Sequence, residues 1–207
     1  MKHEWRKKEK AIYLPKTKAE VIEVPEFQFF TIRGEGNPGN ESFSRYIETL
    51  YSLSYAIRMS HKKGLEPEGF YEYTVYPLEG VWDINEEAKK TFDGTINKDD
   101  FVFQLMIRQP NFVTADYAAQ IIEMVRDKKP NELLDEVKFE RIKEGKCIQM
   151  LHLGSYDDEP GTFEIMENFA QENGLRRRSK VHREIYLSDA RKTPSDKLKT
   201  VLRFNVE

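Results

Sequence analysis

Apolar residues recur at intervals of three and four residues in two stretches of the chain, which is the spacing of one face of an α-helix. In residues 41–64 the spacing runs through Phe43, Leu50 and Ile57, and residues 162–174 repeat it. Acidic residues and a proline precede the second stretch and a glycine follows it, as expected at the two ends of a helix. The spacing therefore predicts one helix in each stretch.

Short runs of β-branched and aromatic residues, several with alternating polar and apolar positions, predict strands before and after each helix. Each set reads strand, glycine-containing turn, helix, strand, strand. The strands, with the turns that follow some of them, occupy residues 27–39, 71–83, 99–110, 145–161, 180–192 and 198–207.

The repeated order predicts an α+β fold of two tandem, duplicated strand-helix-strand-strand units. We expect antiparallel sheets with helices on one face and a central ligand cleft, because a pseudo-twofold would bring the uncovered faces or edges of the units together. The predicted parts are an N-terminal arm (1–26), a first unit (27–113), a bridging helical segment (114–137) that Pro130 interrupts, and a second unit (138–207).

Composition and charge reduce the number of functional classes to which the protein could belong. The 207 residues are 39% hydrophobic and 33% charged, which is typical of a soluble globular protein, and the net charge of −3 argues against direct nucleic-acid binding. No stretch has the length of a membrane span or a signal peptide. The single cysteine, Cys147, excludes an intrachain disulfide framework and fits a reducing compartment. We expect a cytoplasmic protein without a membrane partner, and the sequence indicates no particular protein partner.

Two patterns that could imply a cofactor or a metal are excluded. Gly34, Gly36 and Gly39 form a G-x-G-x-x-G motif between a predicted strand and a helix. Pro38 removes an amide from that loop, and a β-rich repeat follows instead of a parallel βαβ series, so we interpret the motif as a turn. The four histidines have no metal-ligand spacing. We expect neither a cofactor nor a metal.

The segment HREIYLSD, residues 182–189, predicts a strand with two different faces. Alternation puts Ile185 and Leu187 on an apolar face, and Glu184 and Tyr186 on the other. The second face is either solvated or lines a site. A carboxylate on the floor of an aromatic cleft would be partly desolvated, which raises its pKa by up to ~3–5 units. Such a group could attract cationic aromatic ligands or act as a general base.

Aromatic side chains offer walls for such a cleft. Trp82 follows a strand end and a turn, where it either caps the edge of a sheet or contacts a flat ligand, and Tyr156 in the turn of the second unit has the same two interpretations. Tyr71 and Tyr73 share one strand face, which belongs either to the core or to the cleft.

Five segments together resemble the GyrI-like small-molecule-binding family, from about residue 10 to the end of the chain. That family includes gyrase-inhibitory proteins and the effector domains of bacterial multidrug-sensing transcription activators. This chain is most similar to the freestanding members, because residues 1–26 are too short for a helix-turn-helix domain. The segments are RGEGNP (33–38), YPLEGVW (76–82), FVFQLMIRQPNFVT (101–114), QMLHLGSYDDEP (149–160) and HREIYLSDARK (182–192).

The resemblance implies roles for particular residues. In family effector domains a buried glutamate among aromatic residues receives lipophilic cations, and Glu184 matches it. Some freestanding members hydrolyse cyclopropane-bearing genotoxins, which implies that Glu184 activates water and that a tyrosine, Tyr186 first and Tyr156 second, polarises the carbonyl group that activates the ring. The implied flat-ligand contacts are Trp82 and Tyr156, and the predicted ligand-binding set is completed by Tyr73 and His152.

The sequence therefore predicts a protein that binds flat lipophilic or cationic compounds and detoxifies reactive cyclopropane-bearing ones by hydrolysis. Whether it is an enzyme stays open at this point, since a non-catalytic drug-sequestering protein and a gyrase-interacting module are alternatives. Asp83 stands where the family pattern leads us to expect a second aromatic residue, so the preferred shape or charge of the ligand would differ here.

Overall fold

The computed structural model describes residues 2–207. The chain divides into two compact units, and three strands, Glu20–Glu35, Leu78–Ile84 and Lys138–Leu153, contribute residues to both. Unit 1 consists of the residues up to Glu4, with Phe27–Leu78 and Asp83–Ile142, and unit 2 consists of Trp5–Glu26, Glu79–Trp82 and Lys143–Glu207.

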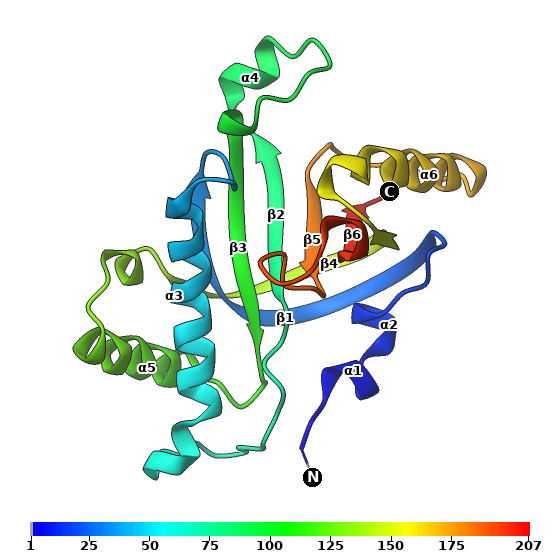
Figure 1. Cartoon of the computed structure of the whole chain (residues 1–207). Helices are drawn as coiled ribbons and strands as arrows, with labels where there is room; N and C mark the ends of the chain where they lie inside the picture. Colours follow the sequence, from blue (N-terminus) through cyan, green and yellow to red (C-terminus); the bar gives the residue numbers. More distant parts are fainter. Residues whose placement is uncertain (1) are drawn as a thin grey trace. The chain divides into compact units, whose positions relative to one another are not determined.

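The α+β class predicted from the sequence is confirmed (Figure 1). The strands are β1 (Glu20–Glu35), β2 (Leu78–Ile84), β3 (Phe101–Gln109), β4 (Lys138–Leu153), β5 (His182–Tyr186) and β6 (Lys199–Asn205). The helices are α1 (Trp5–Lys8), α2 (Lys10–Tyr13), α3 (Glu41–Arg58), α4 (Glu86–Lys90), α5 (Ala115–Lys128) and α6 (Glu159–Glu172). Short 3-10 helices are η1 (Ser60–Lys63), η2 (Lys98–Asp100), η3 (Glu132–Asp135), η4 (Tyr156–Asp158) and η5 (Ser195–Lys197).

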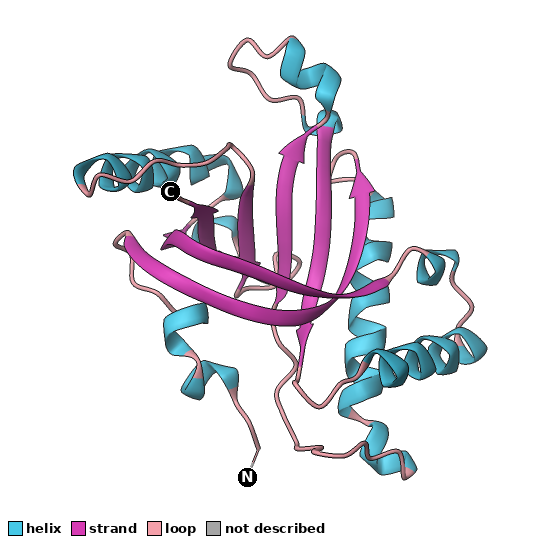
Figure 2. Ribbon diagram, turned by 180° about the vertical axis from the view of Figure 1, so that it is seen from behind, coloured by secondary structure: helices cyan, strands magenta, loops and turns pink. Residues whose placement is uncertain are grey.

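The strands form a closed barrel in the order β1-β3-β2-β5-β6-β4. The strands of the first predicted repeat are neighbours in the order β1, β3, β2, and those of the second repeat in the order β5, β6, β4. Along the sequence, each set begins with one strand, which a long helix and then two further strands follow. The duplication itself stays a prediction. Figure 2 shows the strands in magenta, the longest being β1 and β4 with 16 residues each.

Helix α3 carries the apolar stripe predicted for residues 41–64, and its Leu50, Leu53 and Ile57 are fully buried. It packs against β3 and α5 in unit 1. The predicted bridging segment is also helical: α5 ends at Lys128, just before Pro130, and η3 follows. The periodicity of apolar residues was sufficient to predict these helices, because each helix buries one continuous face.

The strand predicted for residues 71–83 begins only at Leu78. Alternating tyrosines precede it, but Tyr73 makes only an isolated bridge to His3, and its ring packs near those of Tyr76 and Phe112. Pro77 lacks the backbone N–H that a ladder needs, which is why prolines are found at strand edges and starts. The aromatic alternation thus reflects packing in unit 1 and not a regular strand.

Unit 2 contains β5, β6 and the part of β4 from Lys143 onward, paired antiparallel, and one face of this sheet packs under α6. An apolar cluster lies there, and Phe163 and Phe169 of α6 pack against it. Its buried members are Ile148, Met150, Met166, Ala170, Leu202, Phe204 and Val206. The predicted second helix is confirmed, although it begins at Glu159 and not at residue 162.

The predicted N-terminal arm is folded in the described structure. Trp5 and Tyr13 are buried, and their ring centroids lie 5.2 Å apart. Strand β1 begins at Glu20, before the predicted start at residue 27, and its register with β3 starts at Gln28. Among the described residues no helix combines the length and apolar character that crossing a membrane requires.

Candidate functional site

Strand β5 has two chemically different faces, as the alternation in HREIYLSD predicted. Glu184 is only 8% exposed, and in the sheet it pairs with Gly80 of β2 and Leu202 of β6. Residues directly opposite each other in an antiparallel pair point to the same side. Glu184 therefore belongs to the sheet face that packs under α6.

A hydrogen bond joins two aromatic residues beside Glu184. Trp82 pairs with His182 in the register of β2 and β5, and its Nε1–H donates to the hydroxyl oxygen of Tyr186 at 2.7 Å. Because Trp82 pairs with His182 and not with Tyr186, this contact runs diagonally across the two strands.

His182 contacts Glu184 from the same strand. Its Nε2 lies 3.2 Å from Oε1 of Glu184, its Nδ1 lies 3.2 Å from the carbonyl oxygen of Lys180, and its ring centroid is 4.7 Å from that of Phe163. The His182 ring therefore lies between the Glu184 carboxyl group, a backbone carbonyl and the Phe163 ring.

Glu159 brings a second carboxyl group to Glu184. It is the first residue of α6, is 6% exposed, and its Oε1 has no donor partner within residues 2–207. Burial raises the pKa of Glu159 to about 10, and the charge of Glu184 and a hydrogen bond between the two side chains add to the shift. The helix N-terminus favours an anion, but desolvation outweighs it here. Glu159 is therefore a neutral acid at pH 7.

Two tyrosines complete the cluster, with ring centroids 6.0 Å apart and planes at 85°. Burial raises the pKa of Tyr186 well above 10, helped by Glu184 and a hydrogen bond to it, while the bond from Trp82 opposes the shift. Burial, then the charges of Glu184 and Glu159, raise the pKa of Tyr156 to about 12. Both phenols are thus protonated donors at neutral pH.

Tyr156 differs from Tyr186 in its surroundings. It lies in η4 and is 37% exposed, and within residues 2–207 its hydroxyl makes no hydrogen bond. The Tyr186 hydroxyl already accepts a hydrogen bond from Trp82. Tyr156 therefore keeps a donor for another molecule.

His152, a predicted ligand-binding residue, uses both ring nitrogens within unit 2. Nε2 lies 2.9 Å from the carbonyl oxygen of Ser155, to which it donates, and Nδ1 lies 2.8 Å from the Thr162 hydroxyl. Between these residues Gly154 has φ +125°, a conformation that favours glycine. His152 thus holds the turn that connects β4 to α6.

Tyr73 and Asp83 belong to unit 1, whereas the cluster around Glu184 consists of unit 2 residues. Tyr73 is fully buried and its hydroxyl donates to the backbone oxygen of Ser54 at 3.3 Å. Asp83, at the position where an aromatic was expected, is bound by Lys89 at 2.6 Å. Of the predicted ligand-binding residues, Trp82, Tyr156 and His152 are in unit 2 with Glu184.

The opposite face of β5 was expected to be apolar, and that expectation was wrong. Ile185 is buried there, but so is Arg183, whose Nη1 lies 2.6 Å from Glu79 and whose Nε lies 3.0 Å from Glu144. Burial raises the pKa of Glu79, and Arg183 opposes the rise. An arginine between two apolar-patterned positions is tolerated because its charge is paired.

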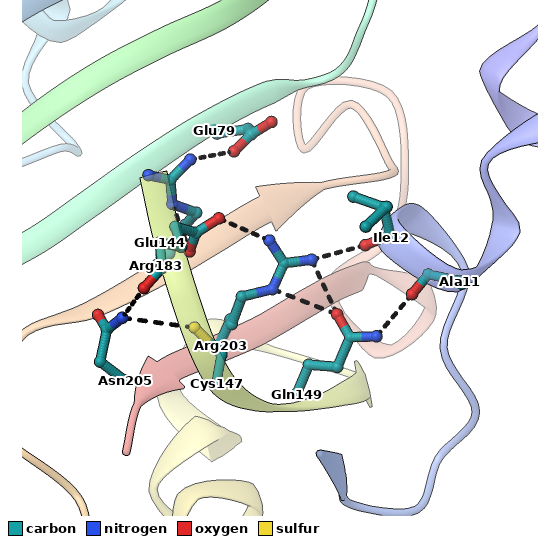
Figure 3. A network of polar contacts seen from close by, with 9 residues as sticks. All are labelled: Ala11, Ile12, Glu79, Glu144, Cys147, Gln149, Arg183, Arg203 and Asn205. Atoms are coloured by element: carbon teal, nitrogen blue, oxygen red, sulfur yellow. Dashed lines mark hydrogen bonds and ion pairs between the residues drawn. The ribbon is translucent and has the colours of Figure 1, made fainter. Parts of the chain in front are cut away.

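A second arginine extends this buried network into the N-terminal segment. In Figure 3 the guanidinium of Arg203 lies between Glu144, at 2.8 Å, and the amide oxygen of Gln149, at 2.8 Å. It also donates to the backbone oxygen of Ile12 at 2.6 Å, and the Gln149 amide donates to that of Ala11 at 2.7 Å. The network therefore anchors α2 to the strands of unit 2.

Sequence reasoning missed Glu159 and the arginines. Glu159 stands in the segment YDDEPG, where acidic residues and Pro160 served only as signals for the start of a helix. The signal that distinguishes Glu159 is its position on the helix: it is the first residue of α6 and lies on the buried side of that helix. Across residues 2–207 no group of three or more His, Cys, Asp or Glu side chains is arranged to hold a metal ion.

A model of the GyrI-like small molecule binding domain matches residues 17–207. A crystal structure of a hydrolase from Listeria innocua is 36% identical, with a TM-score of 0.91 and coverage of 100% of both chains. A second hydrolase structure from that organism is 35% identical, with a TM-score of 0.89, and covers 99% of this chain and 100% of its own. No curated protein sequence matches the chain.

A more distant structure shares the fold alone. The EcmrR C-terminal domain is 16% identical, with a TM-score of 0.51, and the match covers 92% of this chain and 97% of that one. The likeness to the two Listeria structures, in contrast, extends over the whole length at substantial identity.

Proposed function

Because this chain belongs to the GyrI-like small-molecule-binding domain family, we propose that it binds a flat lipophilic molecule and hydrolyses a reactive cyclopropane ring in it. The observation that carries the proposal is the buried carboxyl group of Glu184 among Trp82, Tyr186 and Tyr156. The hydrolases from Listeria innocua support a catalytic function over binding alone. A ligand cleft beside Glu184 is part of this proposal.

The proposed chemistry needs one base and one hydrogen-bond donor. In a cyclopropane conjugated to a carbonyl group, water attacks a CH₂ carbon of the ring while Glu184 accepts a proton from that water. The ring C–C bond breaks, and its electron pair moves through the conjugated system to the carbonyl oxygen. A phenol stabilises the oxygen as charge develops, and a proton then neutralises it. One water molecule is added overall.

The hydrogen bonds favour different roles for the two tyrosines. The Tyr186 hydroxyl accepts a hydrogen bond from Trp82, and the charge of Glu184 helps to raise the pKa of the phenol, so we propose that Tyr186 orients the base. Tyr156 has its hydroxyl available, so we propose that it donates to the carbonyl oxygen of the ligand. This assignment reverses the order of preference that the family resemblance implied.

Turnover of a cyclopropane-containing enone tests the proposal. Wild-type protein is incubated with the compound in ¹⁸O-labelled water, and the ring-opened product is followed by mass spectrometry. We expect product above the buffer rate, with one labelled oxygen in the new hydroxyl group. Binding of the compound without any product would overturn the hydrolase and leave sequestration, the alternative that the same aromatic cluster supports.

Tyr156→Phe is expected to lower kcat by about 10- to 100-fold, because it removes the donor to the developing oxyanion. The affinity for the unreacted compound should change little. Steady-state kinetics with the cyclopropane-containing enone measures the effect, and Tyr55→Phe, which alters an exposed tyrosine of α3, is the matched control. If Tyr156→Phe leaves kcat unchanged while Tyr186→Phe lowers it, Tyr186 is the donor.

A further inference from the structure

His182 lies next to Glu184 on the same face of β5, two positions earlier in the strand. Nε2 of its ring is 3.2 Å from Oε1 of Glu184, which is within hydrogen-bonding distance. Both side chains are shielded from water, with 20% of the His182 side chain and 11% of the Glu184 side chain exposed. A hydrogen bond between side chains this well shielded can fix the direction in which a carboxyl group points.

The ring of His182 is itself held in place by two neighbours. Phe163 of α6 packs against it in an edge-to-face arrangement, with ring centroids 4.7 Å apart and planes at 66°. Nδ1, the other ring nitrogen, lies 3.2 Å from the backbone carbonyl oxygen of Lys180. In this position the ring presents Nε2 to Glu184.

Arg177 fixes the segment that leads into β5. Its Nη2 donates to the backbone carbonyl oxygen of Lys180 at 2.8 Å. The guanidinium is paired with Glu167 of α6 at 2.7 Å and lies 5.0 Å from the ring centroid of Phe163, and the Arg177 side chain is only 11% exposed. Helix α6 therefore supports His182 directly through Phe163 and indirectly through Glu167 and Arg177.

The same contacts indicate which nitrogen of His182 carries a proton when Glu184 acts as a base. The Lys180 carbonyl oxygen already receives an N–H from Arg177 at 2.8 Å, so it does not depend on the imidazole for a donor. A Glu184 carboxylate has no proton to give, so a hydrogen bond between it and His182 requires a proton on Nε2.

We propose that His182 is a positioning residue for Glu184: its Nε2–H donates a hydrogen bond to Oε1 and holds the carboxylate in the orientation for accepting a proton from water. This role rests on the function proposed above. Because the bond occupies Oε1, the role of accepting the proton falls to Oε2. In this role His182 exchanges no proton with the ligand, and its supports from α6 orient the base before a ligand binds.

Two substitutions separate the donated hydrogen bond from the packing of the ring. His182→Phe keeps an aromatic ring against Phe163 but has no N–H. It should lower kcat for the cyclopropane-containing enone by about 10- to 100-fold, with KM changed by less than about threefold. His182→Gln replaces Nε2–H by an amide N–H, which can donate to the same carboxylate, and should recover most of the loss. Circular dichroism establishes that each variant is folded before its kinetics are compared.

His61→Phe and His61→Gln are the matched controls. His61 belongs to unit 1, and its Nδ1 lies 3.1 Å from the backbone carbonyl oxygen of Arg58. Its ring centroid is 5.3 Å from that of Phe70, so its neighbours include a carbonyl and a phenylalanine, as those of His182 do. Both control variants should turn over the compound at the wild-type rate.

NMR of the ligand-free, ¹⁵N-labelled protein tests the hydrogen bond independently of turnover. Long-range ¹H–¹⁵N correlation spectra show which ring nitrogen of each histidine is protonated, and the signals of His182 are identified by their loss in His182→Gln. At the pH of the kinetic assay Nε2 of His182 should carry a proton. In Glu184→Leu, which removes the acceptor, the ¹⁵N signals of His182 should shift while those of His61 stay in place.

Three outcomes would overturn the inference. A proton on Nδ1 alone, or His182 signals that do not respond to Glu184→Leu, would mean that His182 does not donate to Glu184. A wild-type kcat in His182→Phe would mean that the bond does not position the base. A kcat for His182→Gln as low as that of His182→Phe would mean that the imidazole itself, and not its donated bond, is required.

The two kinds of measurement also separate this inference from the proposed function. If the wild-type protein turns over no cyclopropane compound, the proposed function fails. The NMR spectra still decide whether His182 donates to Glu184, because they require neither a ligand nor a reaction.

Discussion

Glu184→Gln is expected to lower kcat for a cyclopropane-containing enone by about 100- to 10,000-fold, the range typical for loss of a general base. The amide keeps the size of the side chain but cannot accept the proton of the attacking water. The affinity for the unreacted compound should remain within about threefold, because the aromatic neighbours Trp82, Tyr156 and Tyr186 are unchanged. Steady-state kinetics and calorimetric titration measure the two quantities.

The matched control is Glu164→Gln, on the exposed side of α6, which should behave like wild type in both measurements. A Glu184→Gln variant with full turnover would show that the base lies elsewhere. Equal loss of turnover and of affinity would instead show that Glu184 stabilises the bound compound and the transition state to the same extent. The pattern of kcat against affinity thus separates a catalytic carboxylate from a binding one.

Arg203→Met is expected to lower the free energy of unfolding by about 3–5 kcal/mol, the usual effect of removing one partner from a buried ion pair. Arg203 is 1% exposed and binds Glu144, Gln149 and the backbone of Ile12. Methionine fills much of the same space but leaves the Glu144 carboxylate with fewer donors. Urea unfolding at constant pH, followed by circular dichroism, measures the change.

Arg176→Met is the control for this prediction. Arg176 pairs with Glu207 on the surface, and its side chain is 82% exposed, so its loss should change the unfolding midpoint little. If Arg203→Met were as stable as Arg176→Met, the buried network would contribute nothing beyond the packing of its side chains. In that case the anchoring of the N-terminal segment would depend on Trp5 and Tyr13 instead.

Helices and most strands followed from the sequence because each buries one face with a regular period. The stripe through Leu50 and Ile57 of α3 is a clear example. The tyrosines before Pro77 failed as a strand prediction, since alternation records only that side chains point in two directions. Closure of the strands into a barrel could not be read from periodicity, because it depends on pairing between strands far apart in sequence.

The candidate site followed from the sequence only in part. The alternation in β5 predicted that Glu184 and Tyr186 share a face, since that depends on local geometry alone. The hydrogen bond from Trp82 to Tyr186 joins residues 104 positions apart, and Glu159 reaches Glu184 from another element. Arg183 was missed because a charged residue at an inward position is stabilised by partners, such as Glu79, that no local pattern reveals.

Strand β5 restricts how this protein can evolve. Successive residues of the strand serve opposite sides of one sheet, with Glu184 in the candidate site and Arg183 in the ionic network. Inserting or deleting a single residue within His182–Tyr186 would exchange the two sides, placing a guanidinium under α6 and the Glu184 carboxyl group among the arginines. New ligand preferences are therefore expected to arise by substitution in the turn around Tyr156, because a substitution there leaves the alternation of β5 unchanged.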